Sequence, residues 1–369
     1  MDMPLIAMSV GHFIFSVCIA TMRVKFYNTA MMHFEKMKSC SFLRALFYTR
    51  SVRMGAVVFF VCALLVSCGT AAKTDANGWH HDFDAAKKIA QKQHKNILLV
   101  FSNARAYATE RNTVLQETVF KRKEFVDAVS DTLVLVNINF SDDESAAQRE
   151  KKAQLVLMYN IVDMPAVFLL TGEGYYLAQL IYDSAYNSPE LYARMVKERQ
   201  TENETISSAV EVLKKSRGAE KVRALNALYE RMPNGYGWCL LDVIRSVPTL
   251  DKKNETGLVP KYVLEAATAD ALFAFSKQDV AGAAQCFVDA AMSKKLDAEH
   301  AQQAYYLAGT MLASGGSTDY DAILRYFQLS CNAAPESMHA ENIRQTMTHL
   351  ETLIAEERAA QAIRAADAK

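Results

Sequence analysis

The sequence predicts an α/β domain followed by an all-helical domain. Between residues 77 and 199, short apolar runs of strand length alternate with segments whose apolar residues recur at helical spacing. From residue 200 onward the helical spacing continues and strand-like runs are lacking. Once the apolar stretch near the N-terminus is set aside, the remaining length suits two domains.

The first domain is predicted from nine segments. Helices are expected where apolar residues share one side, as Phe83, Ala86 and Ala90 do. The run 97–101 is apolar throughout, which is typical of a strand covered on both faces. The expected helices are 82–95, 110–120, 125–129, 146–159 and 189–198, and the expected strands are 97–101, 133–140, 166–170 and 176–181.

This order of elements resembles the thioredoxin-like family, especially its exported thiol–disulfide interchange branch. The matching residues are Trp79, the 85–90 helix, Lys95, Leu99-Val100-Phe101-Ser102, Val119-Phe120, Ile161-Val162-Asp163-Met164-Pro165, Gly172 and Gly174. The resemblance implies a thioredoxin-like domain over 77–199.

Pro165 matches a proline that the family holds in the cis form, facing its active site. In the family, the backbone of the preceding residue pairs with an extended substrate peptide by β-strand addition. Met164 has that position here. The alternative is that Pro165 only opens a strand, where its missing N–H costs nothing.

The sequence departs from the family at the catalytic Cys-x-x-Cys. No cysteine occurs from 69 to 238, and disulfide exchange requires a thiolate. Tyr107 is placed where the family has an aromatic beside its first cysteine. We therefore predict the fold without the redox chemistry and without a catalytic residue. The groove near Tyr107, Met164 and Pro165, with Arg105 and Arg111 close by, could hold a peptide or an acidic group, or it could be vestigial.

Other candidate sites in this domain are weak. His80-His81-Asp82 could suggest a metal, but adjacent histidines are more often solvent-facing. Asp142-Asp143-Glu144 lacks the ligand spacing of a calcium loop and is interpreted as a solvated loop. Ser102 has no recognisable His/Asp partner or Gly-x-Ser-x-Gly context. We predict neither a metal nor a cofactor.

The second domain, 200–369, resembles tetratricopeptide repeats. Ala283, Phe287 and Ala290 have the spacing of the second repeat helix. The next unit fits at Ala304, Leu307, Ala308, Met311, Ala322, Tyr326 and Leu329. An ordinary helical bundle is the alternative. The expected helices are 205–215, 219–231, 239–246, 261–277, 280–294, 298–313, 320–333 and 337–366, with turns at Pro248 and Pro260 among others.

The N-terminal region resembles the leader of bacterial lipoproteins. An apolar stretch, 54–66, follows several basic residues and ends in Leu65-Val66-Ser67-Cys68, which is similar to a lipobox. The resemblance implies that 1–67 is a leader, with 1–36 an over-extended gene start, that Cys68 is lipidated, and that 68–76 is a tether. The alternatives are a membrane helix at 4–22 or a short anchor at 54–67.

Charge and cysteine usage exclude some functions. The leader holds seven of the 41 basic and two of the 41 acidic residues, so 68–369 has a net charge near −5. That balance argues against a nucleic-acid surface. Besides Cys68, the segment 68–369 contains three cysteines: Cys239, Cys286 and Cys331. They are too scattered for a zinc site or a disulfide framework. We therefore expect these three cysteines to be buried and to act as small apolar residues.

Together these features predict a lipid-anchored protein that binds proteins or peptides, or acts as a scaffold, in the cell envelope. It would face the periplasm from the inner or outer membrane, or lie on the cell surface. Its partners would be envelope or exported proteins or peptides, with no nucleic acid and no evident small-molecule substrate. An enzyme is the less favoured class. The alternatives are a thiol–disulfide oxidoreductase that uses a cysteine outside the usual motif, and a purely structural lipoprotein.

Overall fold

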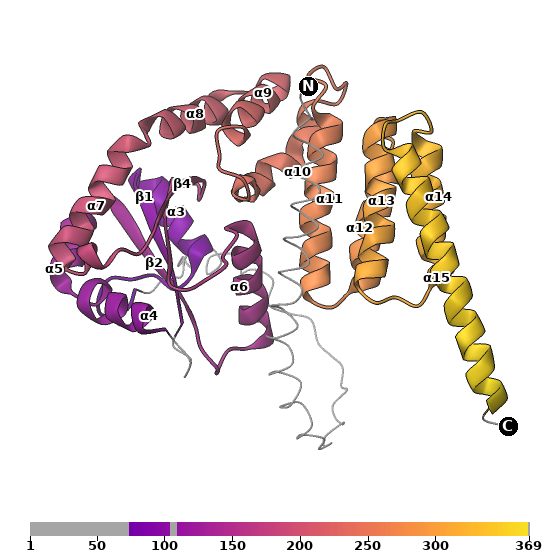
Figure 1. The fold of residues 1–369 in the computed structure, drawn as a ribbon. Helices are drawn as coiled ribbons and strands as arrows, with labels where there is room; N and C mark the ends of the chain where they lie inside the picture. Colours follow the sequence, from indigo (N-terminus) through magenta and orange to yellow (C-terminus); the bar gives the residue numbers. More distant parts are fainter. Residues whose placement is uncertain (1–73, 104–108, 368–369) are drawn as a thin grey trace, which may run out of the picture. The chain divides into compact units, whose positions relative to one another are not determined.

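The computed structural model describes residues 74–103 and 109–367, which belong to one compact unit, Thr70–Lys369. An α/β region comes first and an all-helical region follows it (Figure 1). Strands β2 (Leu133–Phe140) and β3 (Ala166–Leu170) occupy the predicted residues. Cys68 and Tyr107 lie outside the described residues.

The four strands form a mixed sheet in the order β2-β1-β3-β4, where β1 is Asn96–Asn103 and β4 is Tyr176–Leu180. β1 runs parallel to β2 and antiparallel to β3, which is antiparallel to β4. Phe101 pairs with Ile138 on one side and with Ala166 on the other. The ends of β1 and β2 and the start of β3 therefore meet at one end of the sheet.

Both faces of the sheet are buried under helices, as the apolar run in β1 predicts. Ile97, Leu99 and Phe101 belong to one apolar cluster, and Leu98 and Val100 to another. The first cluster includes residues of α3 (Phe83–Gln93) and residues at the end of α6 (Ala146–Met158). The second includes residues of α4 (Glu110–Leu115), α5 (Lys123–Val129) and α7 (Pro189–Glu202).

The helix after β1 is irregular, where the sequence predicts a regular helix over 110–120. α4 continues as a π-helical segment, Gln116–Phe120. Leu115, Val119 and Phe120 are all buried in the second cluster. A π turn aligns residues five apart, so Leu115 and Phe120 can both face the sheet.

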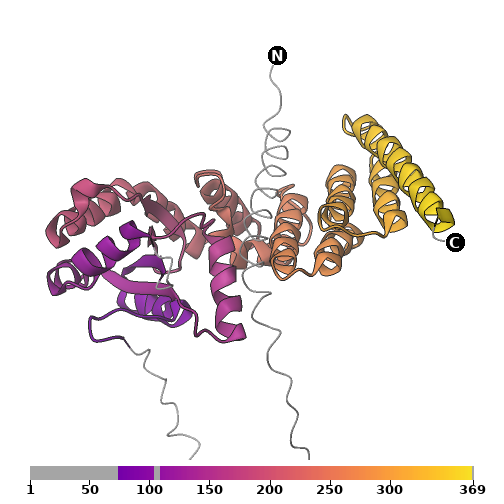
Figure 2. The same ribbon diagram turned by 60° about the horizontal axis from the view of Figure 1, so that its bottom comes forward.

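The second region is helical, and consecutive helices lie side by side from α11 to α15 (Figure 2). Ala283, Phe287 and Ala304 are buried between them. A Cβ atom added at Gly309 would lie 2.9 Å from the Phe327 ring, so α13 and α14 approach closely there. The helices are α8 (Glu204–Lys215), α9 (Gly218–Tyr229), α10 (Leu241–Leu250), α11 (Val259–Ser276), α12 (Val280–Met292), α13 (Ala298–Ser314), α14 (Tyr320–Ala333) and α15 (Ala340–Asp367), with short 3-10 segments at Ser184–Tyr186 and Gly237–Leu240.

Two prolines expected in turns lie in helices instead. Pro248 is inside α10, two residues before its last residue. Ile244 and Val247 of that helix are buried, and their packing offsets the backbone hydrogen bond that a proline cannot donate. Pro260 lies in the first turn of α11, where no intrahelical N–H donor is required.

The sheet and the first helices of the second region share one apolar cluster, which runs from Phe168 to Leu213 and Leu225. The outer edge of β4 is covered by the segment that precedes α10. The Tyr176 ring stacks on Tyr236 with 4.4 Å between centroids, and the Tyr176 N–H donates to Cys239 Sγ at 3.3 Å. This cover protects an edge strand whose backbone groups could otherwise pair with another chain.

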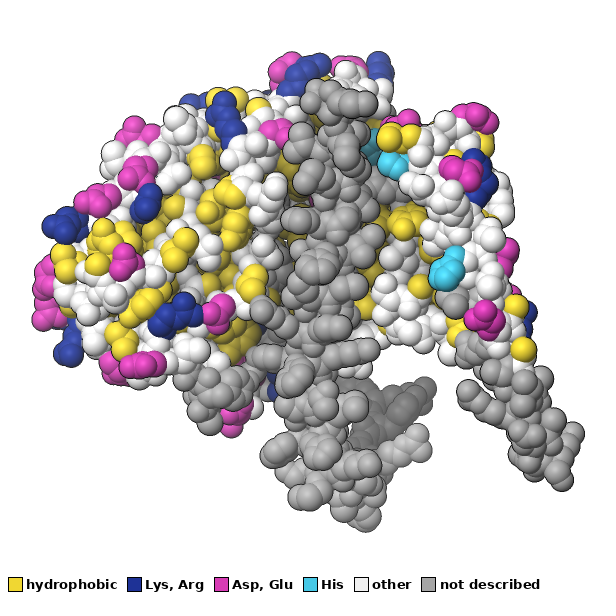
Figure 3. Space-filling model, in the orientation of Figure 1, with side chains coloured by type: hydrophobic (Ala, Val, Ile, Leu, Met, Phe, Trp, Pro, Cys, Tyr) yellow, Lys and Arg dark blue, Asp and Glu magenta, His cyan; other side chains and the backbone are white. Residues whose placement is uncertain are grey.

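The described helices include none that is both long and apolar enough to cross a membrane. On the face shown in Figure 3, hydrophobic side chains gather over the sheet-containing region, and acidic and basic side chains are interspersed.

Candidate functional site

The candidate site lies where β1 ends, β3 begins and α4 starts. The Met164–Pro165 peptide bond is cis, as the sequence predicts, and it directly precedes β3. The pairing of Phe101 with Ala166 places this bond beside the end of β1. We call the surface formed by 162–165 and 181–182 the Met164 edge.

The backbone of Met164 already has partners within the chain. Its N–H donates to Asp163 Oδ1 at 2.9 Å, and its carbonyl oxygen accepts from Thr109 Oγ1 at 3.3 Å. Both bonds involve exposed side chains. Each neutral or exposed bond of this kind stabilises the folded state by only about 1 kcal/mol.

Thr109 also fixes the start of α4. It is the N-cap residue, and its hydroxyl accepts from the Asn112 N–H at 3.3 Å. The buried Asn112 side chain in turn accepts from the Asn103 N–H at 3.0 Å and donates to the Asn103 carbonyl at 2.7 Å. The end of β1, the N-terminus of α4 and Met164 are thereby held together by side chains.

Arg111 joins three segments at the Met164 edge. It forms an ion pair with Asp163, and its guanidinium lies 5.9 Å from the centroid of the Tyr182 ring. The Arg111 charge is therefore paired within the chain. This pairing weakens the interpretation that Arg111 binds an external acidic group, and Arg105 lies outside the described residues.

Apolar side chains are exposed at the same edge. Val162 is 68% exposed and Ile181 is 78% exposed. Val167 pairs with Leu180, so Ile181 lies beside the start of β3. Met164 is half-buried. Large apolar side chains left in water at one edge indicate a surface that can bind a partner.

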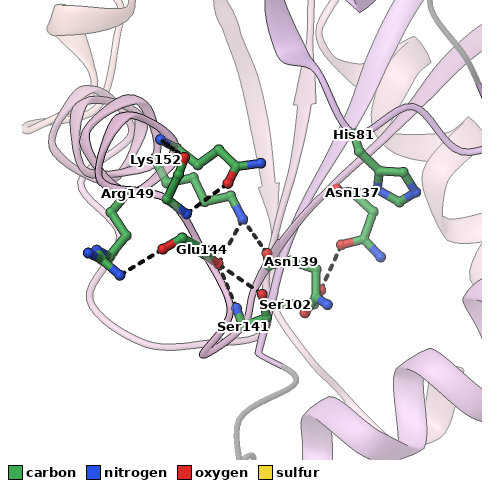
Figure 4. A network of polar contacts seen from close by, with 10 residues as sticks. His81, Ser102, Asn137, Asn139, Ser141, Glu144, Arg149 and Lys152 are labelled. Carbon is green, nitrogen blue, oxygen red and sulfur yellow. Dashed lines mark hydrogen bonds and ion pairs between the residues drawn. The ribbon is translucent and has the colours of Figure 1, made fainter. Parts of the chain in front are cut away.

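The carboxyl ends of β1 and β2 carry a partly buried polar network (Figure 4). Ser102 Oγ lies 2.7 Å from Asn137 Oδ1 and 3.2 Å from Asn139 Oδ1. Asn137 Nδ2 donates to Gln116 Oε1 of the π-helical segment at 3.3 Å. These contacts give Ser102 a structural role, and its side-chain partners among the described residues are asparagines.

Glu144 corrects the interpretation of 142–144 as a solvated loop. Asp142 and Asp143 are exposed, but Glu144 is buried and pairs with Lys152 of α6 at 2.9 Å. Lys152 also donates to the Asn139 carbonyl, and Glu144 accepts from the Ser141 N–H at 2.6 Å (Figure 4). The ion pair fixes the loop after β2 to α6.

The adjacent histidines, His80 and His81, differ in burial. His80 is buried, contrary to the expectation of a solvent-facing residue. Its backbone N–H donates to the Leu135 carbonyl, which forms an isolated bridge beside β2. Burial lowers the pKa of His80, and the neighbouring His81 lowers it further. His81 lies 2.9 Å from the Asn137 carbonyl through Nδ1 and 3.3 Å from Asp75 through Nε2. Within 74–103 and 109–367, no group of three potential metal ligands gathers.

The described cysteines are free thiols with raised pKa values. Burial raises the pKa of Cys239 to about 12, and it also raises the pKa values of Cys286 and Cys331. A raised pKa leaves little thiolate near neutral pH, which disfavours nucleophilic chemistry.

Comparison with known proteins gives matches to a family model, to a curated protein and to a solved structure. A family model described as an uncharacterised protein C-terminal domain matches residues 258–357. An uncharacterized protein of Treponema pallidum (strain Nichols) is 24% identical over 212 residues, which cover 56% of this chain and 69% of that protein. A solved structure titled DsbH oxidoreductase is 20% identical, with a TM-score of 0.30, and the match covers 34% of this chain and 90% of that one. At this TM-score the likeness carries no argument about the fold.

Proposed function

We propose that the chain is a lipid-anchored protein of the cell envelope that binds extended segments of other exported proteins. In this proposal 77–199 is a redox-inactive thioredoxin-like module and 200–369 is a tetratricopeptide-like region. Cys68 is the lipid attachment site, and the envelope location follows from its similarity to a lipobox.

The observation that carries the proposal is the exposed apolar surface around Met164. Val162 and Ile181 are both more than two-thirds exposed, and they flank the residue whose backbone pairs with peptides in the thioredoxin-like family. An extended segment added there would gain main-chain hydrogen bonds, and its side chains would cover the two apolar ones.

Binding would require a modest rearrangement. A segment that pairs with Met164 must replace the Asp163 and Thr109 contacts, which are exposed and of ordinary length. Exchange of one hydrogen bond for another costs little net free energy. Burial of a valine or isoleucine side chain stabilises a complex by about 1.5–3 kcal/mol, so apolar contact is the larger effect.

Thiol chemistry is the competing function, and the described cysteines disfavour it. Cys239 is buried in the shared core, where its thiol contacts the Tyr176 N–H and Met232 Sδ, at 3.3 and 3.6 Å. A disulfide substrate has no access to a sulfur in this position without unfolding. The raised pKa of Cys286 and Cys331 also lowers their reactivity.

Binding can be tested with fluorescein-labelled, reduced and carboxymethylated α-lactalbumin, a permanently unfolded protein. Its anisotropy is measured with the full chain in a non-ionic detergent. We expect saturable binding that Val162→Asp and Ile181→Asp each weaken by roughly tenfold, since 1.4 kcal/mol corresponds to one decade.

Val212→Asp is the matched control. Val212 is 57% exposed on α8, outside the Met164 edge, so the same change of chemistry should leave the affinity within about twofold. Equal binding by all three variants and the parent would contradict the proposal.

A further inference from the structure

The helical region contains a concave surface, which the proposed peptide binding does not use. A cavity of about 330 Å³ lies between the turn that follows α10 and the turn that joins α12 to α13. Four lysines line it: Lys252 and Lys253 on the first turn, and Lys294 and Lys295 on the second. We call it the four-lysine pocket.

The four lysines are exposed, and none of them forms an ion pair with a described residue. Several other lysines of the described chain are paired, including Lys152 and Lys261. Unpaired ammonium groups gathered around one cavity create a positive potential that attracts an anion.

The first turn is held rigidly by its own polar groups. Asp251 is buried; one carboxylate oxygen accepts from the Glu255 N–H at 2.8 Å, and the other accepts from Thr256 N–H and Oγ1, at 2.9 and 2.6 Å. Asn254 has a left-handed backbone, and its Oδ1 accepts from the Val259 N–H at 3.0 Å. Lys252 and Lys253 are therefore presented by a fixed backbone.

Two carboxylates, of Asp251 and Asp297, also line the pocket, and their negative charge offsets part of the positive charge of the lysines. The Asp251 oxygens are bonded within the turn. Asp297 caps α13, where its Oδ1 accepts from the His300 N–H at 2.9 Å and contacts His300 Nδ1 at 2.8 Å. Four lysines against two internally bonded aspartates leave the lining positive, in a chain whose formal net charge is zero.

Both α11 and α13 begin at this pocket, since Val259 and Pro260 of α11 line it and so does Asp297, the N-cap residue of α13. The N-termini of these helices add partial positive charge to that of the lysines. The cavity volume is at the lower end of small-ligand pockets, and a concave site suits a compact solute better than a flat surface.

We propose that the four-lysine pocket binds a small soluble phosphate ester or diphosphate. Lysine binds phosphate as a point charge, and several lysines can share the oxygens of one or two phosphoryl groups. The proposal is independent of peptide binding at the Met164 edge.

The test is titration calorimetry of the full chain, in non-ionic detergent at physiological ionic strength, with inorganic pyrophosphate as the probe. We expect one saturable site. The double substitution Lys253→Glu/Lys295→Glu should weaken it by at least roughly tenfold. Lys253 and Lys295 are chosen because they line the pocket from its two different turns.

Lys88→Glu/Lys92→Glu on α3 is the matched control, because both lysines are exposed and the change of charge is the same. It should alter the affinity by less than about twofold. Three outcomes would overturn the proposal: no saturable binding, an equal loss in both double variants, or binding to phosphatidylglycerol vesicles without binding of pyrophosphate.

Discussion

Met164 has both of its backbone polar groups bonded to exposed side chains of its own chain, one before it and one from the N-cap of α4. The contact with Thr109 cannot be read from the sequence, because Thr109 lies 55 residues before Met164 and the two meet only through the fold. The identity of Pro165 did predict the cis bond, since it stands at the opening of a strand in a matching pattern. The exposure of Val162 and Ile181 was not predictable either, because apolar residues beside strands are usually buried.

Glu144 and Lys152 form a largely buried ion pair, with 4% and 18% of their side chains exposed. Glu144→Gln removes the charge and leaves the Lys152 ammonium in a partly buried position. We expect the free energy of unfolding, measured by urea denaturation, to fall by about 3 kcal/mol. Asp143→Asn in the same loop is exposed and should change it by less than about 0.5 kcal/mol. Similar effects of the two substitutions would show that Glu144 is solvated.

The cysteine thiols should react slowly in the folded protein. A pKa raised to about 12 leaves Cys239 almost entirely protonated at pH 8, and its reaction with iodoacetamide should accelerate only as the pH rises toward that value. The half-buried Cys286 should be modified before the buried Cys239 and Cys331. Mass spectrometry of native and urea-unfolded protein measures this order. Rapid modification of Cys239 at pH 8 in the folded protein would restore the thiol-enzyme alternative.

At the scale of elements, the sequence is most informative where apolar residues are continuous or strictly periodic. β2, β3 and α14 begin and end at the predicted residues. The predictions differ from the structure where tertiary packing decides. The π-helical segment after α4 brings Phe120 into the core together with Leu115, and α10 continues through Pro248 because its neighbours are buried.

The polar network at the ends of β1 and β2 was not predicted, because it too depends on tertiary packing. Asn137 and Asn139 alternate with apolar residues, as in a strand with one solvated face, and Ser102 ends an apolar run. In the structure Ser102 is buried, and the polar side chains bond to one another and to Gln116. Hydrogen bonds among these side chains offset much of the cost of their burial, although Gln116 Nε2 has no partner among the described residues, and the network holds the strand ends in place.

At the scale of the molecule, the sheet and the helices α8 to α11 share one apolar cluster. Leu213 and Leu225, on the C-terminal side of the predicted boundary at 199, are fully buried with Phe168 of the sheet. The change in pattern at this position marks a change of secondary structure from mixed to helical, while the hydrophobic core continues across it. Met164 itself packs against this shared cluster, so the Met164 edge is supported by the same core as the helices.

The most direct test of the account is hydrogen–deuterium exchange of the full chain with and without carboxymethylated α-lactalbumin. β-Strand addition at the Met164 edge predicts slower amide exchange in peptides that span 161–164 and 181–182, and no change in α12 to α14. Slower exchange confined to the helical region, or none anywhere while the unfolded protein is bound, would contradict the proposal that this edge binds extended segments.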